Sequence, residues 1–266
     1  MITETSSADR WSHFSTSAGQ VSRATRSGAI TKALDKEGVD ASYINVLERK
    51  STGTSVILLD SKSGERTILT CRGASNQFGN FSEADLDMIH PEWLYVTTLG
   101  GDMDTLERFL SKAHAIGTKV MFNPGIKELR NKTELAQLLK YVDVLNVNKS
   151  EAAEIVPGNT LVELLYRLNN YVDIVIITDG AMGGIAGDGE EIYRFGIYED
   201  RKVKDATGAG DAFGSGFLAH FANGKSFRSS LIFASANSTA VVTKMGANRG
   251  ALCGNEPLHP MPIQKL

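Results

Sequence analysis

The sequence predicts an α/β fold, with a mostly parallel central sheet covered by helices on both faces and a small antiparallel sheet beside it. The first observation is the region after residue 93, where short apolar runs alternate with segments whose apolar residues recur at helical spacing. The second is the region 43–71, whose short β-like runs predict a small antiparallel sheet of their own. The third is size, because 266 residues with 42% hydrophobic side chains can bury one large core.

The region after residue 93 predicts the elements of the main sheet. Strands are expected at 93–97, 118–122, 142–145 and 172–178. Helices are expected around 106–113, 129–139, 148–155 and 161–168. A hairpin is expected at Ile185–Phe195, and two further helices at 205–243 with a turn at Asn223-Gly224. Strands and helices that alternate at this spacing favour parallel strand pairing.

The region 43–71 contains three β-like runs: Tyr43–Leu47, Thr54–Leu59 and Arg66–Cys71. Between the last two, Ser61-Lys62-Ser63-Gly64 is typical of a hairpin turn. We therefore expect the three runs to form one small antiparallel sheet beside the main sheet.

The stretch from Asp205 to Phe213, which reads D-A-T-G-A-G-D-A-F, carries the strongest chemical signal. A Gly-Ala-Gly turn that opens a helix leaves backbone N–H groups without partners inside the helix. Together with the helix dipole, these donors form an anion site that small side chains leave accessible. Asp211 in the first turn would lie beside a bound phosphate and could take a proton from an attacking hydroxyl.

This stretch resembles the C-terminal signature of the ribokinase (PfkB) family, although members more often have Thr where this chain has Ala206. The resemblance implies a three-layer ribokinase-like fold. It also implies that Asp211 is the catalytic base, and it assigns roles to further residues of the stretch. The anion hole would consist of the N–H groups of Gly208, Ala209 and Gly210, and a monovalent cation such as K⁺ would bind at Asp205 and Thr207.

Two further segments resemble family motifs. Asn148-Lys149-Ser150-Glu151 matches the N-x-x-E motif, which implies that Asn148 and Glu151 help to hold Mg²⁺, with Glu151 acting through water. The segment that begins at Thr178 resembles the T-x-G-x-x-G loop of the nucleotide site. The nucleotide-binding residues expected from these resemblances are Thr178, Gly180, Gly183 and Asn237.

The lid and the N-terminus resemble the family less closely. Arg72 and Asn76 follow the lid strands and are expected to face the substrate, with a solvated surface role as the alternative. Residues 1–27 contain neither the acidic strand end nor the Gly-Gly motif with which members normally begin. We therefore divide the chain into an atypical N-terminal segment, 1–27, and a ribokinase-like kinase domain, 28–266, with lid strands at about 43–71. Either residues of the natural protein are missing from this chain, or the natural protein is shortened.

The resemblance implies an ATP-dependent phosphotransferase that moves the γ-phosphate of MgATP to a hydroxyl of a sugar or sugar-like molecule. A nucleoside kinase, or a nucleotide-binding relative without activity, is the alternative. A dinucleotide-dependent oxidoreductase is disfavoured, because Gly208-Ala209-Gly210 lacks the last glycine of G-x-G-x-x-G. The net charge of −3 gives no reason to expect nucleic acid or a membrane as a partner. We expect a cytoplasmic protein with two reduced cysteines, and a homodimer formed through the lid strands is an open alternative to a monomer.

Overall fold

The computed structural model describes most of the 266-residue chain. The described residues are 15–16, 19–22, 25–47, 50–59, 66–76, 81–198, 201–247, 249–253, 258 and 260–266. No helix in these ranges is long and apolar enough to cross a membrane.

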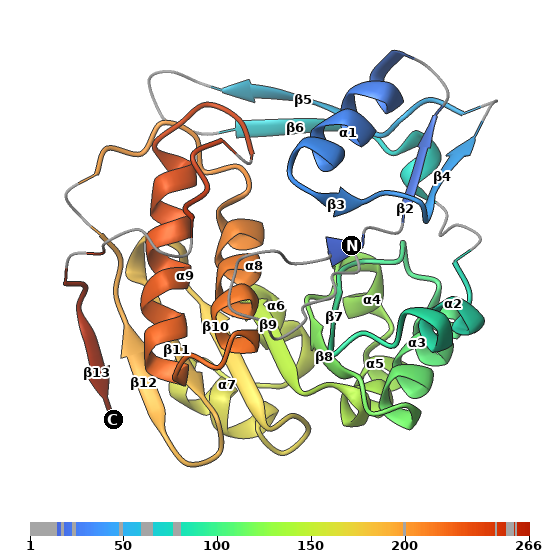
Figure 1. Cartoon of the computed structure of the whole chain (residues 1–266). Coiled ribbons are helices and arrows are strands. Elements are labelled where there is room, and N and C mark those ends of the chain that lie inside the picture. Colours follow the sequence, from blue (N-terminus) through green and yellow to red (C-terminus); the bar gives the residue numbers. More distant parts are fainter. Residues whose placement is uncertain are drawn as a thin grey trace.

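The centre of the molecule is a seven-stranded sheet with the order β13-β12-β11-β10-β9-β8-β7 (Figure 1). Its strands are β7 (Trp93–Val96), β8 (Lys119–Phe122), β9 (Val144–Asn148), β10 (Ile174–Thr178), β11 (Gly184–Gly187), β12 (Ile192–Phe195) and β13 (Ile263–Lys265). The pairs from β7 to β10 are parallel, as predicted, whereas β10–β11, β11–β12 and β12–β13 are antiparallel. Parallel strands therefore end together at one edge of the sheet.

Helices cover both faces of this sheet, which confirms the three-layer α/β prediction. One face packs on α2 (Glu83–Ile89), α3 (Met103–Ala115), α4 (Ile126–Arg130), α5 (Lys132–Leu138), α6 (Lys149–Ile155) and α7 (Leu161–Leu168). The other packs on α8 (Ala209–Ala222) and α9 (Phe227–Val242), which lie side by side in Figure 1. Successive residues of β7 alternate between the two cores, Leu94 in the first and Tyr95 in the second. All four β7 side chains are therefore buried.

Local sequence signals set several helix boundaries. Helix α7 has the predicted limits, because the Thr160 side chain accepts a hydrogen bond from the Glu163 N–H at its start. The helix predicted at 129–139 is instead two helices, α4 and α5, followed by a 3₁₀ turn, η2 (Leu139–Tyr141). Asn131 interrupts it with φ −92° and ψ 52°, outside the helical region.

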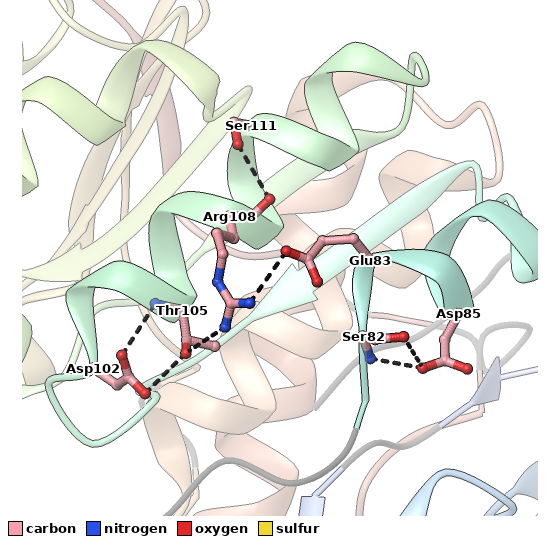
Figure 2. Close-up of polar contacts among 7 residues, drawn as sticks. All are labelled: Ser82, Glu83, Asp85, Asp102, Thr105, Arg108 and Ser111. Atoms are coloured by element: carbon pink, nitrogen blue, oxygen red, sulfur yellow. Dashed lines mark hydrogen bonds and ion pairs between the residues drawn. The ribbon is translucent and has the colours of Figure 1, made fainter.

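Polar contacts connect α2 with α3, two neighbouring helices on the same face of the sheet (Figure 2). The Asp102 side chain caps α3 by accepting from the Thr105 N–H at 3.0 Å, and Thr105 in turn accepts from Arg108 at 3.2 Å. Arg108 also lies 3.4 Å from Glu83 of α2. Both partners of this ion pair are solvent-accessible, so the pair adds little, and the buried Leu86 is the main anchor of α2.

The lid lies beyond one end of the main sheet (Figure 1). It contains β1 (Ser15–Thr16), β2 (Gly19–Ser22), α1 (Thr25–Lys36), β3 (Val39–Asp40), β4 (Ile44–Leu47), β5 (Thr54–Leu59), β6 (Arg66–Cys71) and the 3₁₀ turn η1 (Gly73–Asn76). Strands β5 and β6 form the predicted antiparallel pair, and the turn predicted between them lies outside the described residues. The prediction for the third run was wrong, because β4 pairs in parallel with β2 and not with the hairpin.

Candidate active site

Two adjoining cavities open at the edge where the parallel strands end. The first, about 320 Å³, is lined by Asn123, Asn146, Val147, Asn148, Glu151, Thr178 and the segment 206–211. The second, about 420 Å³, shares Thr178, Ala206, Ala209 and Gly210 with the first and continues toward α9. Ligands of open α/β sheets bind outside the carboxyl ends of strands, so the location itself indicates a ligand site.

The turn before α8 depends on Gly208. Its φ of +80° is one that side chains rarely adopt, and a Cβ there would lie 1.9 Å from the main-chain oxygen of Ala247. The helix begins immediately afterwards, with the Ala212 N–H donating to the Gly208 oxygen at 2.8 Å. Glycine at this position therefore lets the turn pack against the loop at 247 while it starts the helix.

Several amide groups of this turn are available for a ligand. The Ala209 N–H donates to the Ala206 oxygen at 3.4 Å. The N–H groups of Gly208, Gly210 and Asp211 have no hydrogen-bond partner in the part of the chain that the structure describes. They belong to the start of a 14-residue helix that borders the first cavity, which is the geometry of an anion site.

Asp211 lies in the first turn of α8 and lines the first cavity. Among the described residues, its carboxylate forms no hydrogen bond and no ion pair. The residue is reached by solvent, but partial burial of the carboxylate raises its pKa above the usual value. A free carboxylate beside an anion site can accept a proton from a hydroxyl that attacks a phosphoryl group.

Asn148 and Glu151 also line the first cavity. They form a reciprocal cap of α6, in which the Glu151 N–H donates to Asn148 and the Asn148 N–H donates to Glu151, both at 2.9 Å. Burial raises the pKa of Glu151, and the hydrogen bonds from Asn148 partly offset this. No group of three or more His, Cys, Asp or Glu side chains in the described ranges could enclose a metal ion. A metal here would therefore need phosphate or water ligands as well as these two residues.

Asp205 and Thr207 precede the turn. The Asp205 carboxylate accepts from the Thr207 N–H at 2.9 Å and from the Gly246 N–H at 3.1 Å. The hydroxyl oxygen of Thr207 is buried and has no hydrogen-bond partner in the described part of the chain. A buried oxygen next to a carboxylate fits the oxygen ligands that a monovalent cation requires.

The second cavity has mainly apolar walls, which include Phe195, Ile197, Val203, Phe213 and Val242. Three predicted nucleotide-binding residues, Thr178, Gly180 and Gly183, line it as well. Gly183 is required for close approach, because a Cβ there would lie 2.0 Å from the main-chain oxygen of Phe195. An apolar cavity with a few polar groups is suited to a flat heteroaromatic base.

Two predicted site residues, Asn237 and Arg72, are not among the residues that line these cavities. Asn237 is 5% exposed, donates to the Ala212 oxygen at 2.7 Å and accepts from the Leu252 N–H at 2.8 Å, so it holds α9 to its neighbours. Arg72 lies exposed after β6, and Asn76 ends η1 with a side chain outside the described part.

The sequence reading missed Asn123 and Asn146, which line the first cavity. Asn123 directly follows β8, at the carboxyl end of a parallel strand, where ligands of open α/β sheets bind. Asn146 lies two residues before Asn148, and this period of two would have placed it on the same side of β9. Strand alternation combined with the position at a strand end could therefore have identified it.

Comparison with known proteins agrees with this geometry. The model of the pfkB family of carbohydrate kinases matches residues 9–252. The chain is 26% identical over 229 residues to a ribokinase from Haemophilus influenzae, which covers 82% of this chain and 72% of the relative. It is 34% identical over 229 residues to an ATP-dependent 6-phosphofructokinase from Thermoanaerobacterium thermosaccharolyticum, with 82% and 70% covered.

Solved structures show the same fold. A ribokinase from Arabidopsis thaliana, in complex with ribose and ATP, matches with a TM-score of 0.75 and 22% identity, covering 90% of this chain and 79% of that one. A nucleoside kinase from Methanocaldococcus jannaschii matches with a TM-score of 0.74 and 21% identity, covering 90% and 77%. The family match spans nearly the whole described fold and both cavities, and the chain therefore belongs to the pfkB family of carbohydrate kinases.

Proposed function

We propose that this carbohydrate kinase transfers the γ-phosphate of MgATP to a hydroxyl group of a sugar or nucleoside, with Asp211 as the base. The observation that carries the proposal is that one cavity contains the Asp211 carboxylate and backbone amides that have no hydrogen-bond partner among the described residues, next to an apolar cavity of about 420 Å³. A phosphoryl donor and an acceptor hydroxyl could meet at Asp211 from the two sides.

The residues of the first cavity would act mainly by position and charge. Asp211 would accept the proton of the acceptor hydroxyl as its oxygen attacks phosphorus. The N–H groups of Gly208, Gly210 and Asp211 would donate to the oxygens of the transferring group, where negative charge accumulates. Since these donors are fixed by the helix start, they need no rearrangement during the reaction.

Asn148 and Glu151 would hold Mg²⁺ through water, and Asp205 with Thr207 would hold K⁺. Bound Mg²⁺ would neutralise phosphate charge. A ribokinase II structure from E. coli, with a TM-score of 0.77 and 21% identity, contains ATP and Mg²⁺, which supports the choice of metal. The K⁺ site is supported by the buried Thr207 oxygen next to the Asp205 carboxylate.

The apolar cavity would bind the base of ATP, with Thr178, Gly180 and Gly183 along its wall. Arg72 and Asn76 stay proposals for the acceptor side, and so does a homodimer formed through the lid. The relatives include kinases named for ribose, fructose, fructose 6-phosphate and ribose 1-phosphate, so the acceptor is a matter for experiment.

The test is ATP consumption measured over a panel of sugars, sugar phosphates and nucleosides, with Asp211→Asn as the matched variant. We expect turnover with at least one acceptor and a loss of about 10²–10⁴-fold in kcat for the variant, because general base catalysis is removed. Calorimetry with a non-hydrolysable ATP analogue should give similar affinities for both proteins. Equal turnover in both would reject the assigned base, and nucleotide binding without turnover on any acceptor would identify an inactive relative.

A further inference from the structure

Two polar side chains lie buried in the otherwise apolar layer between the sheet and α8. Tyr95 of β7 is 5% exposed and Asn146 of β9 is 4% exposed. Their neighbours on this face of the sheet, such as Met121 and Val144, are apolar. The Tyr95 hydroxyl oxygen and the Asn146 Oδ1 atom have no hydrogen-bond partner within the described residues. Buried polar atoms without partners are costly, and their retention beside an active site calls for an explanation.

The two side chains meet at one point on α8, which is Gly214. A Cβ at Gly214 would lie 2.4 Å from the Tyr95 hydroxyl oxygen and 2.8 Å from Asn146 Nδ2. Gly214 is three residues after Asp211, so both residues lie on the same face of the helix. The missing side chain of Gly214 therefore gives the hydroxyl and the amide access to the turn that carries Asp211.

One member of the pair, Asn146, reaches the first cavity. Asn146 lines this cavity together with Asp211, and the Asn123 side chain donates to the main-chain oxygen of Asn146 at 2.6 Å, which fixes the strand end. Burial, and then the negative charge of Asp211, raise the pKa of Tyr95. The Tyr95 hydroxyl thus stays protonated and lies within electrostatic range of the Asp211 carboxylate. The other titratable side chain that lines this cavity, among the described residues, is Glu151 of α6.

We propose that Tyr95 and Asn146 are positioning residues, which orient the ionised carboxylate of Asp211 toward the acceptor hydroxyl across the gap that Gly214 leaves. This inference rests on the proposed role of Asp211 as the base. The Asn146 amide nitrogen and the Tyr95 hydroxyl border the same gap at Gly214, and the Tyr95 O–H, which has no partner among the described residues, would donate toward the carboxylate across this gap. Such a hydrogen bond would favour the charged, proton-accepting form of Asp211 and would offset the effect of its burial.

The test compares Tyr95→Phe with Tyr193→Phe. Tyr193 is also buried on this face of the sheet, but its hydroxyl donates to Glu191 at 2.7 Å, and it lines neither cavity. In Tyr95→Phe, loss of a donor to the carboxylate should move the acid limb of the kcat/KM profile up by about 0.5–1 pH unit. Activity should fall by about 3–10-fold at a pH below that limb and little above it, since one unit of pKa is a tenfold change in the ionised fraction. Tyr193→Phe should leave the profile unchanged.

A second readout does not depend on turnover. The Asp211 carboxyl carbon can be titrated by NMR in isotope-labelled protein, with its signal identified through Asp211→Asn. Tyr95→Phe should raise the titration midpoint by the same amount, and Gly214→Ala should raise it as well, because the added methyl group displaces the hydroxyl. If the titrations of Tyr95→Phe and Tyr193→Phe coincide, the inference is wrong. If the wild-type protein phosphorylates no acceptor, the proposed function fails, while the titration still decides the position of Tyr95.

Discussion

Replacement of Gly208 by alanine tests the geometry on which the active site depends. At Gly208 the backbone has φ +80°, and the new Cβ would lie 1.9 Å from the main-chain oxygen of Ala247 and 2.7 Å from its carbon. The nearest atoms belong to the backbone, so no side-chain rotation can relieve the contact. The turn must either move away from the loop at 247 or adopt a different conformation.

The matched control is Gly224→Ala at the other end of α8. Gly224 has a similar φ of +72°, but nothing lies within 4 Å of a Cβ there. Both variants incur about 1–2 kcal/mol for a side chain in the left-handed region. Only Gly208→Ala adds the contact, and overpacking of this kind costs about 1–3 kcal/mol more. We therefore expect the free energy of unfolding to fall by about 2–5 kcal/mol in Gly208→Ala and by about 1–2 kcal/mol in Gly224→Ala.

The effect on catalysis should separate the two variants further. Displacement of the turn moves the Gly210 and Asp211 amides, and loss of one such donor typically lowers kcat about 10²–10³-fold. Gly224→Ala should keep its kcat, because the start of α8 is unchanged. Urea unfolding and steady-state kinetics on both proteins provide the two measurements. If the two variants match in stability and in kcat, then close packing against Ala247 does not hold the anion site, and the reasoning is refuted.

Three further changes test other parts of the structure. Glu128→Ala should lower the free energy of unfolding by about 3–5 kcal/mol in urea titrations, because this fully buried carboxylate accepts from a threonine hydroxyl and from backbone N–H groups of the loops after β7 and β8. Val203→Asp should weaken binding of an ATP analogue about tenfold or more by calorimetry, because it puts a charge into the apolar cavity. Asp211→Asn should raise Tm at pH 8. Burial raises the pKa of Asp211, so its charged form opposes folding, and the gain should vanish as the pH falls toward about 4.

Matched controls decide these three predictions. The exposed Glu134→Ala on α5 should change stability little, and an equal loss would contradict the role of Glu128. Val162→Asp on α7 adds the same charge away from both cavities, so an equal loss of affinity would argue against nucleotide binding beside Val203. A Tm gain for Asp211→Asn that is the same at pH 4 and pH 8 would show that ionisation of Asp211 is not its cause.

Much of the main sheet could be predicted because its signals are local. The alternation of apolar strands with helical periodicity gave the α/β class, and a capping pair at Thr160 and Glu163 fixed the start of α7. The pairing of β4 with β2 could not be predicted, because it joins segments that are far apart and short, and neither has a turn signal that points to the other.

The candidate site also has a part that could be predicted from the sequence and a part that could not. The turn at 208–211 was predictable because glycine, helix start and aspartate are consecutive in the sequence. Tyr95 resembles any apolar strand residue until Gly214 is seen opposite it in space. Asn237 illustrates the reverse case, because its neighbours in sequence suggested a ligand contact, whereas both ends of its side chain are used inside the fold.

The partition between the two cavities has a consequence for attempts to change what the enzyme accepts. Apart from Thr178, the residues that border both compartments are Ala206, Ala209 and Gly210, and none of these three has a side chain larger than methyl. Because these small residues present mainly main chain to the cavities, a point mutation at any of them would disturb both compartments at once. Variants selected for a new acceptor should therefore carry their substitutions at the asparagine-lined strand ends or in the lid, while this strip stays as it is.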